Sequence, residues 1–408
     1  MRRSQIRKYT EYFLLYFLIA ITAVPYFYSD IEFFILGFFI SSFIFIRRKK
    51  KFDKHFLIIF GCFLLIELLQ AVYFSNFELT TTIGTFIRLG FAYTCAKVLG
   101  NKFYDYFFNI IYFFSIVSLF FYIPSLISNS FADFFVNNFA DFFVSPFYTK
   151  SDFYVLSPNI IIYTFEKSLF VSSRNSGPFW EPGAFAVFLI LAIIFRLIKM
   201  QKITDKKNLL LALVLLTTTS TTGYIALFLV VVFFIVFNKK VKASKYAFVI
   251  IILYGASLAY AQIEFLGKKA EEDIQLASET TSSRFGSALV DLKDFSQNPI
   301  VGYGRGTNRY AGKGFVFFSA EQHRNNGLTQ LLVTYGIIIS VLYFVYYYKN
   351  IKRYCRVCVF NEKFALGAFF IILILGFSQP IFVRPFFYAL LFVNIKPIKL
   401  KKTNAVSL

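Results

Sequence analysis

The chain alternates between long apolar runs and short polar segments that are mostly basic. Hydrophobic residues make up 57% of its 408 residues and charged residues only 16%, whereas an ordinary soluble domain has about 25% charged residues. The apolar runs extend over about 16–24 residues, the length that a helix needs to cross a bilayer. The pattern predicts an all-α fold, a polytopic membrane bundle of about twelve transmembrane helices.

Two long polar segments interrupt the apolar runs and divide the chain into five regions. They are an N-terminal five-span region (1–127), a first long loop (128–182), a middle four-span region (183–262), a second long loop (263–324) and a C-terminal three-span region with a basic tail (325–408). The spans themselves are predicted at about 11–28, 31–46, 55–74, 80–98, 103–127, 183–199, 208–220, 222–237, 246–262, 326–348, 364–379 and 382–395.

The basic residues indicate the orientation of these spans. They gather in clusters between apolar runs, such as Arg47–Lys51 and Lys239–Lys242, and such clusters are typical of cytoplasmic loops. Both termini are therefore expected in the cytoplasm and both long loops outside. The same distribution argues against nucleic-acid binding despite the net charge of +21, because a nucleic-acid site gathers its basic residues on one face.

The N-terminal run and the cysteines exclude two further classes. Residues 12–28 contain no small-residue cleavage site, which favours an uncleaved first span over a signal peptide. None of the four cysteines falls in a long loop, so no disulfide framework is expected. Cys355 and Cys358 form a lone CxxC pair, and we expect no metal site and no cofactor.

The first long loop contains a short duplication. Phe131–Val136 and Phe139–Val144 both read Phe-Ala-Asp-Phe-Phe-Val. The spacing of eight places like residues at nearly the same azimuth of a helix, and an aromatic helix with so little charge is expected to lie flat among lipid headgroups. Two interpretations remain open: a cap that rests on the membrane, or a lid that guides lipid over a site.

Ser172–Gly183, at the end of the same loop, is the densest candidate for chemistry. It holds Arg174, Trp180 and Glu181 at the entrance of an apolar run. Charges close to a membrane are costly and usually have a partner or a task. Arg174 is expected to bind a diphosphate, because guanidinium presents a rigid fork to phosphate oxygens. Glu181 would orient or deprotonate a hydroxyl; alternatively, Arg174 and Glu181 pair with each other.

The second long loop keeps arginines although it is expected outside. Arg284 precedes the tight turn segment Asn298–Gly306, and Arg305 lies within it. The glycines of this segment do not fit GxGxxG, and no βαβ pattern surrounds them, so a nucleotide site is not predicted. Outward arginines run against the positive-inside trend, which favours an anionic ligand for both.

The segment His323–Leu332 opens the next apolar run and brings two more candidates. His323 lies at the predicted outer helix entrance close to Asn326. A histidine is commonly structural, but at such an entrance it is equally suited to act as a base or to orient a hydroxyl. We therefore list His323 with Glu181 as catalytic candidates, and Trp180 with Asn326 as candidates for contacts with sugars.

Four of these features occur in order and resemble a known family. They are Gly177-Pro-Phe-Trp-Glu-Pro-Gly183, Thr217–Gly223 between two spans, Asn298-Pro-Ile-Val-Gly-Tyr-Gly304, and the His323–Leu332 entry with Gly336 beyond it. Over residues 170–345 the chain resembles the bacterial O-antigen polymerase and O-antigen ligase family. Members often have adjacent His-Asn where this chain has Arg324 between His323 and Asn325, and Ser-Arg where it has Ser220-Thr.

The resemblance implies a fold, a location and a reaction. Such proteins are helical-bundle membrane glycosyltransferases, GT-C-like in architecture, in the bacterial cytoplasmic (inner) membrane. They act without a metal on polyprenyl-diphosphate-linked oligosaccharides at the outer face, as donor and acceptor. The resemblance also implies a flippase and a chain-length regulator as possible partners, and O-antigen (lipopolysaccharide), capsule or exopolysaccharide as the product.

Three functions follow for comparison. The first is a polymerase that joins polyprenyl-diphosphate-linked repeat units, with Arg174, Arg284 and Arg305 on the diphosphate and Glu181 or His323 as the base. The second is an O-antigen ligase that transfers finished polymer to a lipid A core. The third is a polysaccharide-lipid flippase or transporter, which should place ionisable residues along several spans; here Arg88 and Glu67 are the main ones.

Overall fold

The computed structural model describes residues 3–27, 31–146, 157–165, 174–238, 284–305 and 325–395. In these ranges the protein is helical and contains no strand, apart from one isolated bridge between Asn159 and Thr164. The all-α prediction is confirmed for this part of the chain.

The described helices are α1 (Arg3–Ala23), α2 (Ile31–Arg47), α3 (Lys54–Tyr73), α4 (Leu79–Leu99), α5 (Phe103–Ile127), α6 (Asn129–Phe139), α7 (Pro182–Met200), α8 (Lys206–Thr217), α9 (Thr221–Phe237), α12 (Arg284–Gln297), α13 (Gly327–Val357), α14 (Phe364–Ser378) and α15 (Pro385–Phe392), with 3-10 turns η1 (Gly100–Lys102) and η2 (Ala140–Phe143). Most helices lie close to the predicted apolar segments, whereas α6 and α12 lie in the predicted long loops.

Within the described residues, four helical stretches are long and apolar enough to cross a membrane. They are Lys54–Tyr73, the continuous stretch Leu79–Ile127, Pro182–Met200 and Gly327–Val357. The predicted span 246–262 lies outside the described residues. The count of about twelve spans therefore stays a prediction.

Two predicted spans are shorter helices than expected. The segment 208–220 contains α8, which has 12 residues, and the segment 382–395 contains α15, which has 8 residues. At about 1.5 Å of rise per residue, eight residues extend only about 12 Å, far less than the hydrocarbon core. The prediction of a full helical span at 382–395 was wrong because hydropathy does not distinguish a lipid-facing helix from one surrounded by protein.

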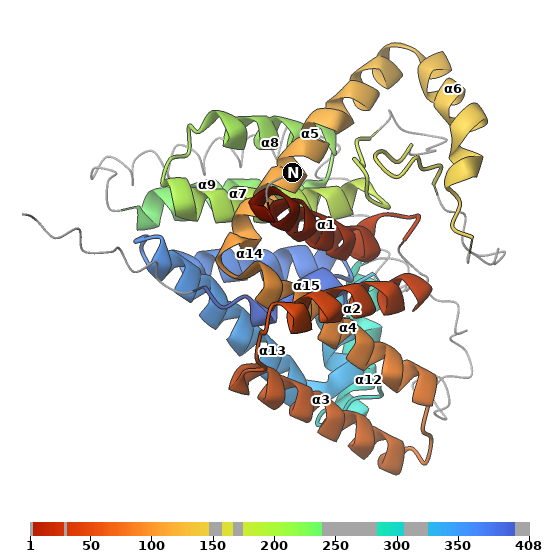
Figure 1. Cartoon of the computed structure of the whole chain (residues 1–408), viewed down its shortest axis with the longest axis vertical. Coiled ribbons are helices and arrows are strands. Elements are labelled where there is room, and N and C mark those ends of the chain that lie inside the picture. The colour runs from red at the N-terminus through yellow and green to blue at the C-terminus, as the bar shows by residue number, and fades with distance from the viewer. Residues whose placement is uncertain are drawn as a thin grey trace, which may run out of the picture.

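Helix α15 occupies the centre of the bundle (Figure 1). Every residue of Pro385–Phe392 is buried, and the helix packs against α4, α1 and α13. The helices α7, α8 and α9 form a neighbouring group on one side of it, and α2, α3 and α4 lie on the other (Figure 1). A helix that is apolar all round is expected to be enclosed in this way.

Segments predicted on the cytoplasmic side contact one another. Glu11 is 1% exposed and forms ion pairs with three basic side chains: Arg7 at 3.1 Å, Arg48 at 2.7 Å and Lys102 at 2.9 Å. Arg196 at the end of α7 pairs with Asp205 before α8 at 2.5 Å, and its guanidinium holds the pKa of Asp205 below the ordinary value. The basic loops therefore meet at one end of the bundle, and the assignment of that end to the cytoplasm stays a prediction.

The duplicated segment of the first loop is not one helix. The first copy lies in α6, whereas the second forms the 3-10 turn η2 and the residues after it. Phe131 and Phe135 of α6 pack against a small buried cluster with Phe121 of α5 and Tyr163 and Phe165 of the loop. The prediction of one helix over both copies was wrong, and the position of α6 among lipid headgroups stays a prediction.

A break in α13 distinguishes it from the other long helices. Gly336 has φ 71° and ψ −178°, which no helix interior contains. The chain segment 299–304 lies against the break: Ile337 N donates to Pro299 O at 2.8 Å, Tyr303 N to Val333 O at 2.8 Å and Gly304 N to Thr334 O at 2.8 Å. The predicted turn 298–306 and the predicted glycine of the following span therefore contact each other.

The buried side chain of Gln70 in α3 completes this junction. Its amide donates to Val301 O at 2.5 Å and to Thr334 O at 2.9 Å. These bonds satisfy carbonyl groups that the broken helix and the inserted segment leave exposed, as the interior of a membrane protein requires.

Gly336→Ala is expected to lower the free energy of unfolding by about 3 kcal/mol or more. The positive φ is strained for any residue with a Cβ, and an added Cβ would overlap the carbonyl oxygen of Ile300. The measurement is the thermal unfolding midpoint of purified protein in detergent. Gly61→Ala in α3 is the control, because a Cβ there meets nothing within 4 Å; equal midpoints for both variants would contradict the account.

Candidate functional site

The run before α7 is anchored by Asn175. This residue is fully buried, and its backbone N donates to Thr217 O at 3.1 Å. Its side-chain amide donates to Ser118 Oγ at 3.1 Å and Thr217 Oγ1 at 2.9 Å, while its Oδ1 accepts from Gly177 N at 3.0 Å. The run is therefore held against α5 and the Thr217–Gly223 turn, which we call the threonine turn.

The threonine turn brings two predicted arginines together. Arg174 Nε donates to Thr219 Oγ1 at 2.7 Å and to Thr218 O at 3.3 Å. Arg284, the first residue of α12, donates from Nη1 to Thr222 Oγ1 at 3.3 Å. Two guanidinium groups from separate long loops thus share one short turn between α8 and α9.

The threonine turn has an unusual backbone. Thr219 has φ 45°, although it is β-branched, and such residues rarely adopt the left-handed region. Ser220 next to it caps α9 by accepting from Gly223 N at 3.2 Å. Strain of this kind persists where the surroundings determine it and is common at functional sites.

Glu181 does not pair with Arg174. It is the residue before α7, and its Oε1 accepts a hydrogen bond from Gln379 Nε2 at the end of α14. A Cβ on Gly183 would approach Gln379 Nε2 to 2.6 Å, so the glycine makes room for this contact. The alternative of an Arg174–Glu181 pair is wrong; the carboxylate instead lies at a helix N-terminus, where a negative charge is stabilised.

Trp180 has a cationic partner. The Cζ of Arg384 lies 5.2 Å from the centroid of its ring, and the Trp180 N donates to Ala23 O at 3.1 Å. This cation–π contact joins the run before α7 to the start of α15. A sugar contact of Trp180 stays a prediction.

Arg305 lies in a second basic group with Arg88 and Arg384. The charges of Arg305 and Arg384 both act on Arg88, which stacks over Phe34 at 4.5 Å. Arg305 Nη1 is buried and has no hydrogen-bond partner. In the described part of the chain neither Arg88 nor Arg305 forms an ion pair.

The nearest buried carboxylate belongs to Glu67. Its Oε2 accepts from Thr82 Oγ1 at 2.8 Å and its Oε1 is buried without a partner. Glu67, Gln70 and Arg305 line a small pocket of about 20 Å³. Glu78 lines the same pocket, so the guanidinium of Arg305 shares it with two carboxylates.

Two predicted site residues, His323 and Asn326, remain. His323 lies outside the described residues. Asn326 is fully buried and caps α13, its Oδ1 accepting from Leu328 N at 3.0 Å and Thr329 N at 3.1 Å. The helix cap gives Asn326 a structural role, and a contact between Asn326 and a sugar stays a prediction.

Sequence reasoning missed three residues near the site. Gln379 and Arg384 flank the break between α14 and α15, and the buried Asp291 of α12 accepts from Thr329 Oγ1 at 2.6 Å. A signal was present for the first two: Gln379-Pro-Ile-Phe-Val-Arg-Pro385 combines charge and prolines at a helix entrance, as Ser172–Gly183 does.

Among the described residues, no group of three or more His, Cys, Asp or Glu side chains could hold a metal ion.

Residues 208–344 match the family model Wzy_C, described as O-antigen ligase. This segment contains the threonine turn, Arg284, Arg305 and Gly336, and the match confirms the family resemblance for this part of the chain. Members of the family are glycosyltransferase-like enzymes. A search of the curated proteins finds no matching relative.

Thr219→Val is expected to lower the free energy of unfolding by about 1.5–3 kcal/mol, because it leaves a charged, part-buried donor without its hydroxyl acceptor. Thermal unfolding in detergent measures the loss. Thr221→Val is the matched control in the same segment, since Thr221 makes no side-chain hydrogen bond there, and should change stability by less than about 0.5 kcal/mol. A loss of equal size in the control would refute the role of the Arg174 contact.

Proposed function

We propose that the protein is a polymerase that joins polyprenyl-diphosphate-linked oligosaccharide repeat units at the outer face of the cytoplasmic membrane. The observation that carries the proposal is the convergence of Arg174 and Arg284 on the threonine turn. The turn and Arg284 lie in the segment that matches the O-antigen ligase family, and Arg174 precedes it. Two guanidinium forks from separate loops suit the two phosphates of a diphosphate. The second basic group, which contains Arg305, supports the same ligand chemistry.

The reaction transfers a glycosyl group. A terminal hydroxyl oxygen of the acceptor unit attacks the anomeric carbon of the donor, and the bond between that carbon and the diphosphate oxygen breaks with its electron pair. Polyprenyl diphosphate leaves, and the hydroxyl proton passes to Glu181 or His323. Negative charge grows on the leaving group, so preorganised arginines beside it lower the barrier most.

The ligase that transfers polymer to a lipid A core is the second candidate. It uses the same type of donor, so the arginines fit both functions, and the matched family is described as O-antigen ligase. We favour the polymerase because the polar residues predicted outside are divided between two long loops that could hold two lipid-linked substrates. Deletion of the gene separates the two: single-unit glycolipid indicates a polymerase, and full-length polymer on the polyprenyl carrier indicates a ligase.

Arg174→Ala and Arg284→Ala are expected to abolish long chains while leaving protein abundance unchanged. Loss of one oriented donor at a charge that develops in the transition state typically costs about 100- to 1,000-fold in rate. The measurement is the chain-length ladder from cells that express each variant, with immunoblots for abundance. Arg47→Ala is the control, because Arg47 is an exposed arginine at the end of α2. Wild-type ladders from both site variants would overturn the assignment of these arginines.

Glu181→Gln tests the base separately from the fold. A glutamine oxygen can still accept the hydrogen bond from Gln379, but the side chain no longer takes up a proton. If Glu181 is the base, the transfer rate should fall about 100- to 10,000-fold with little change in the unfolding midpoint. A variant with full activity would leave the role of base to His323, for which His323→Gln is the companion variant.

A further inference from the structure

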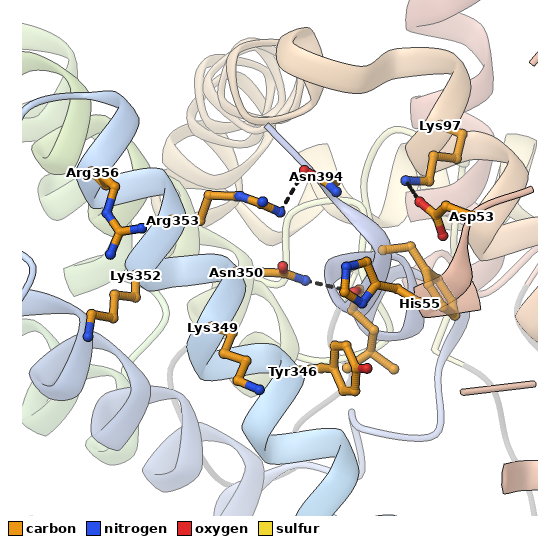
Figure 2. A pocket seen from close by; sticks show the side chains of 12 residues that line it. Asp53, His55, Lys97, Tyr346, Lys349, Asn350, Lys352, Arg353, Arg356 and Asn394 are labelled. Carbon is orange, nitrogen blue, oxygen red and sulfur yellow. Dashed lines mark hydrogen bonds and ion pairs between the residues drawn. The ribbon is translucent and has the colours of Figure 1, made fainter. Parts of the chain in front are cut away.

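A basic pocket lies at the end of the bundle predicted to face the cytoplasm, away from the threonine turn. Its cavity measures about 270 Å³ and lies between the C-terminal half of α13, the start of α3, the end of α4 and the residues after α15. Figure 2 shows Lys349, Lys352, Arg353 and Arg356 along α13, with Asp53, His55 and Lys97 across the cavity. Five lysines and arginines but only one carboxylate line it.

The carboxylates in and near the pocket already form ion pairs. Asp53 pairs with Lys97, and Glu362 outside the pocket pairs with Arg356 at 2.8 Å and with Lys352 at 3.7 Å. Arg353 donates only to the neutral Asn394 Oδ1 at 2.7 Å, and Lys349 lies 5.7 Å from the ring centroid of Tyr346. Lys349 and Arg353 therefore form no ion pair with a carboxylate in the described ranges.

The face of α13 below the pocket is suited to acyl chains. Ile338, Val341 and Val345 are 51%, 51% and 40% exposed, and their spacing places them on the same helix face as Lys349 and Arg356. This face changes from apolar to basic at the level of the pocket. A soluble anion would contact only the basic part of this face, whereas a lipid would contact both the basic and the apolar part.

We propose that this pocket binds the phosphate headgroup of an anionic phospholipid of the cytoplasmic leaflet, with the acyl chains along Ile338, Val341 and Val345. Basic pockets between transmembrane helices on the cytoplasmic side are suited to such headgroups. The cavity is smaller than the roughly 300–1,000 Å³ typical of drug-sized ligands, which fits a glycerophosphate group whose chains remain outside. A bound phosphate offsets the repulsion between the basic residues of α13 and links this helix to α3 and α4.

The test uses phosphatidylglycerol as the probe and the full-length protein in neutral detergent. The thermal unfolding midpoint and the binding of lipid by native mass spectrometry are measured against phosphatidylglycerol, with phosphatidylcholine as the zwitterionic comparison. We expect a rise in the midpoint with phosphatidylglycerol only. Each lysine or arginine near an anionic lipid strengthens the attraction about fivefold, so Lys349→Gln/Arg353→Gln should weaken binding about 25-fold.

A matched variant separates this pocket from general basic charge. Lys202→Gln/Lys206→Gln removes two exposed lysines from the loop between α7 and α8 and should change binding by less than about threefold. Wild-type affinity in Lys349→Gln/Arg353→Gln, or equal weakening in the control, would overturn the pocket. Inorganic phosphate or glycerol phosphate that raised the midpoint as much as the lipid would also overturn the proposal, in favour of a soluble anion.

Discussion

The interruption of α13 at Gly336 is the constraint on which the site region depends. A helix break inside an apolar bundle exposes backbone groups that water cannot reach, and each must find a partner within the protein. Here the segment 299–304 supplies them through Pro299 O, Tyr303 N and Gly304 N, and the Gln70 amide donates both to Val301 O and to Thr334 O, which also accepts from Gly304 N. The hydrogen bonds hold a polar loop against the interior of the bundle, which a continuous helix would exclude.

This insertion also determines where charge lies. Arg305 follows directly on the bonded segment, and its charge acts on Arg88 of α4, as does the charge of Arg384 just before α15. Like charges this close repel one another, and burial adds the cost of lost hydration. The backbone bonds around Gly336 therefore offset an electrostatic cost, and an anionic ligand would remove part of it. The threonine turn likewise stabilises Arg174 and Arg284, because its neutral hydroxyl and carbonyl oxygens accept hydrogen bonds from these guanidinium groups.

Most of the helices could be predicted from the sequence, since a long apolar run can be identified by itself, but α12 falls in a segment expected to be a loop. The surroundings of each helix could not be predicted in this way. Pro385–Phe392 is as apolar as a lipid-facing helix, and its burial depends on contacts with α4 and α1 that no local pattern encodes. Arg174 and Glu181 were correctly grouped as a charged run, but their partners, Thr219 and Gln379, come from distant segments. The role of Gly336 likewise required the partner segment 299–304.

The contrast between the two ends of the bundle bears on the meaning of the arginines. At the end predicted to be cytoplasmic, many basic side chains form ion pairs with carboxylates: Arg48 with Glu11, Lys97 with Asp53, Arg196 with Asp205, Lys199 with Asp105 and Arg356 with Glu362. Lys349 and Arg353 of the basic pocket form none with the described residues. Arg88, Arg284 and Arg305 form no such pair with the described residues. Arginines without an ion pair near the other end are suited to an anionic ligand, which is the ligand chemistry of the proposed function.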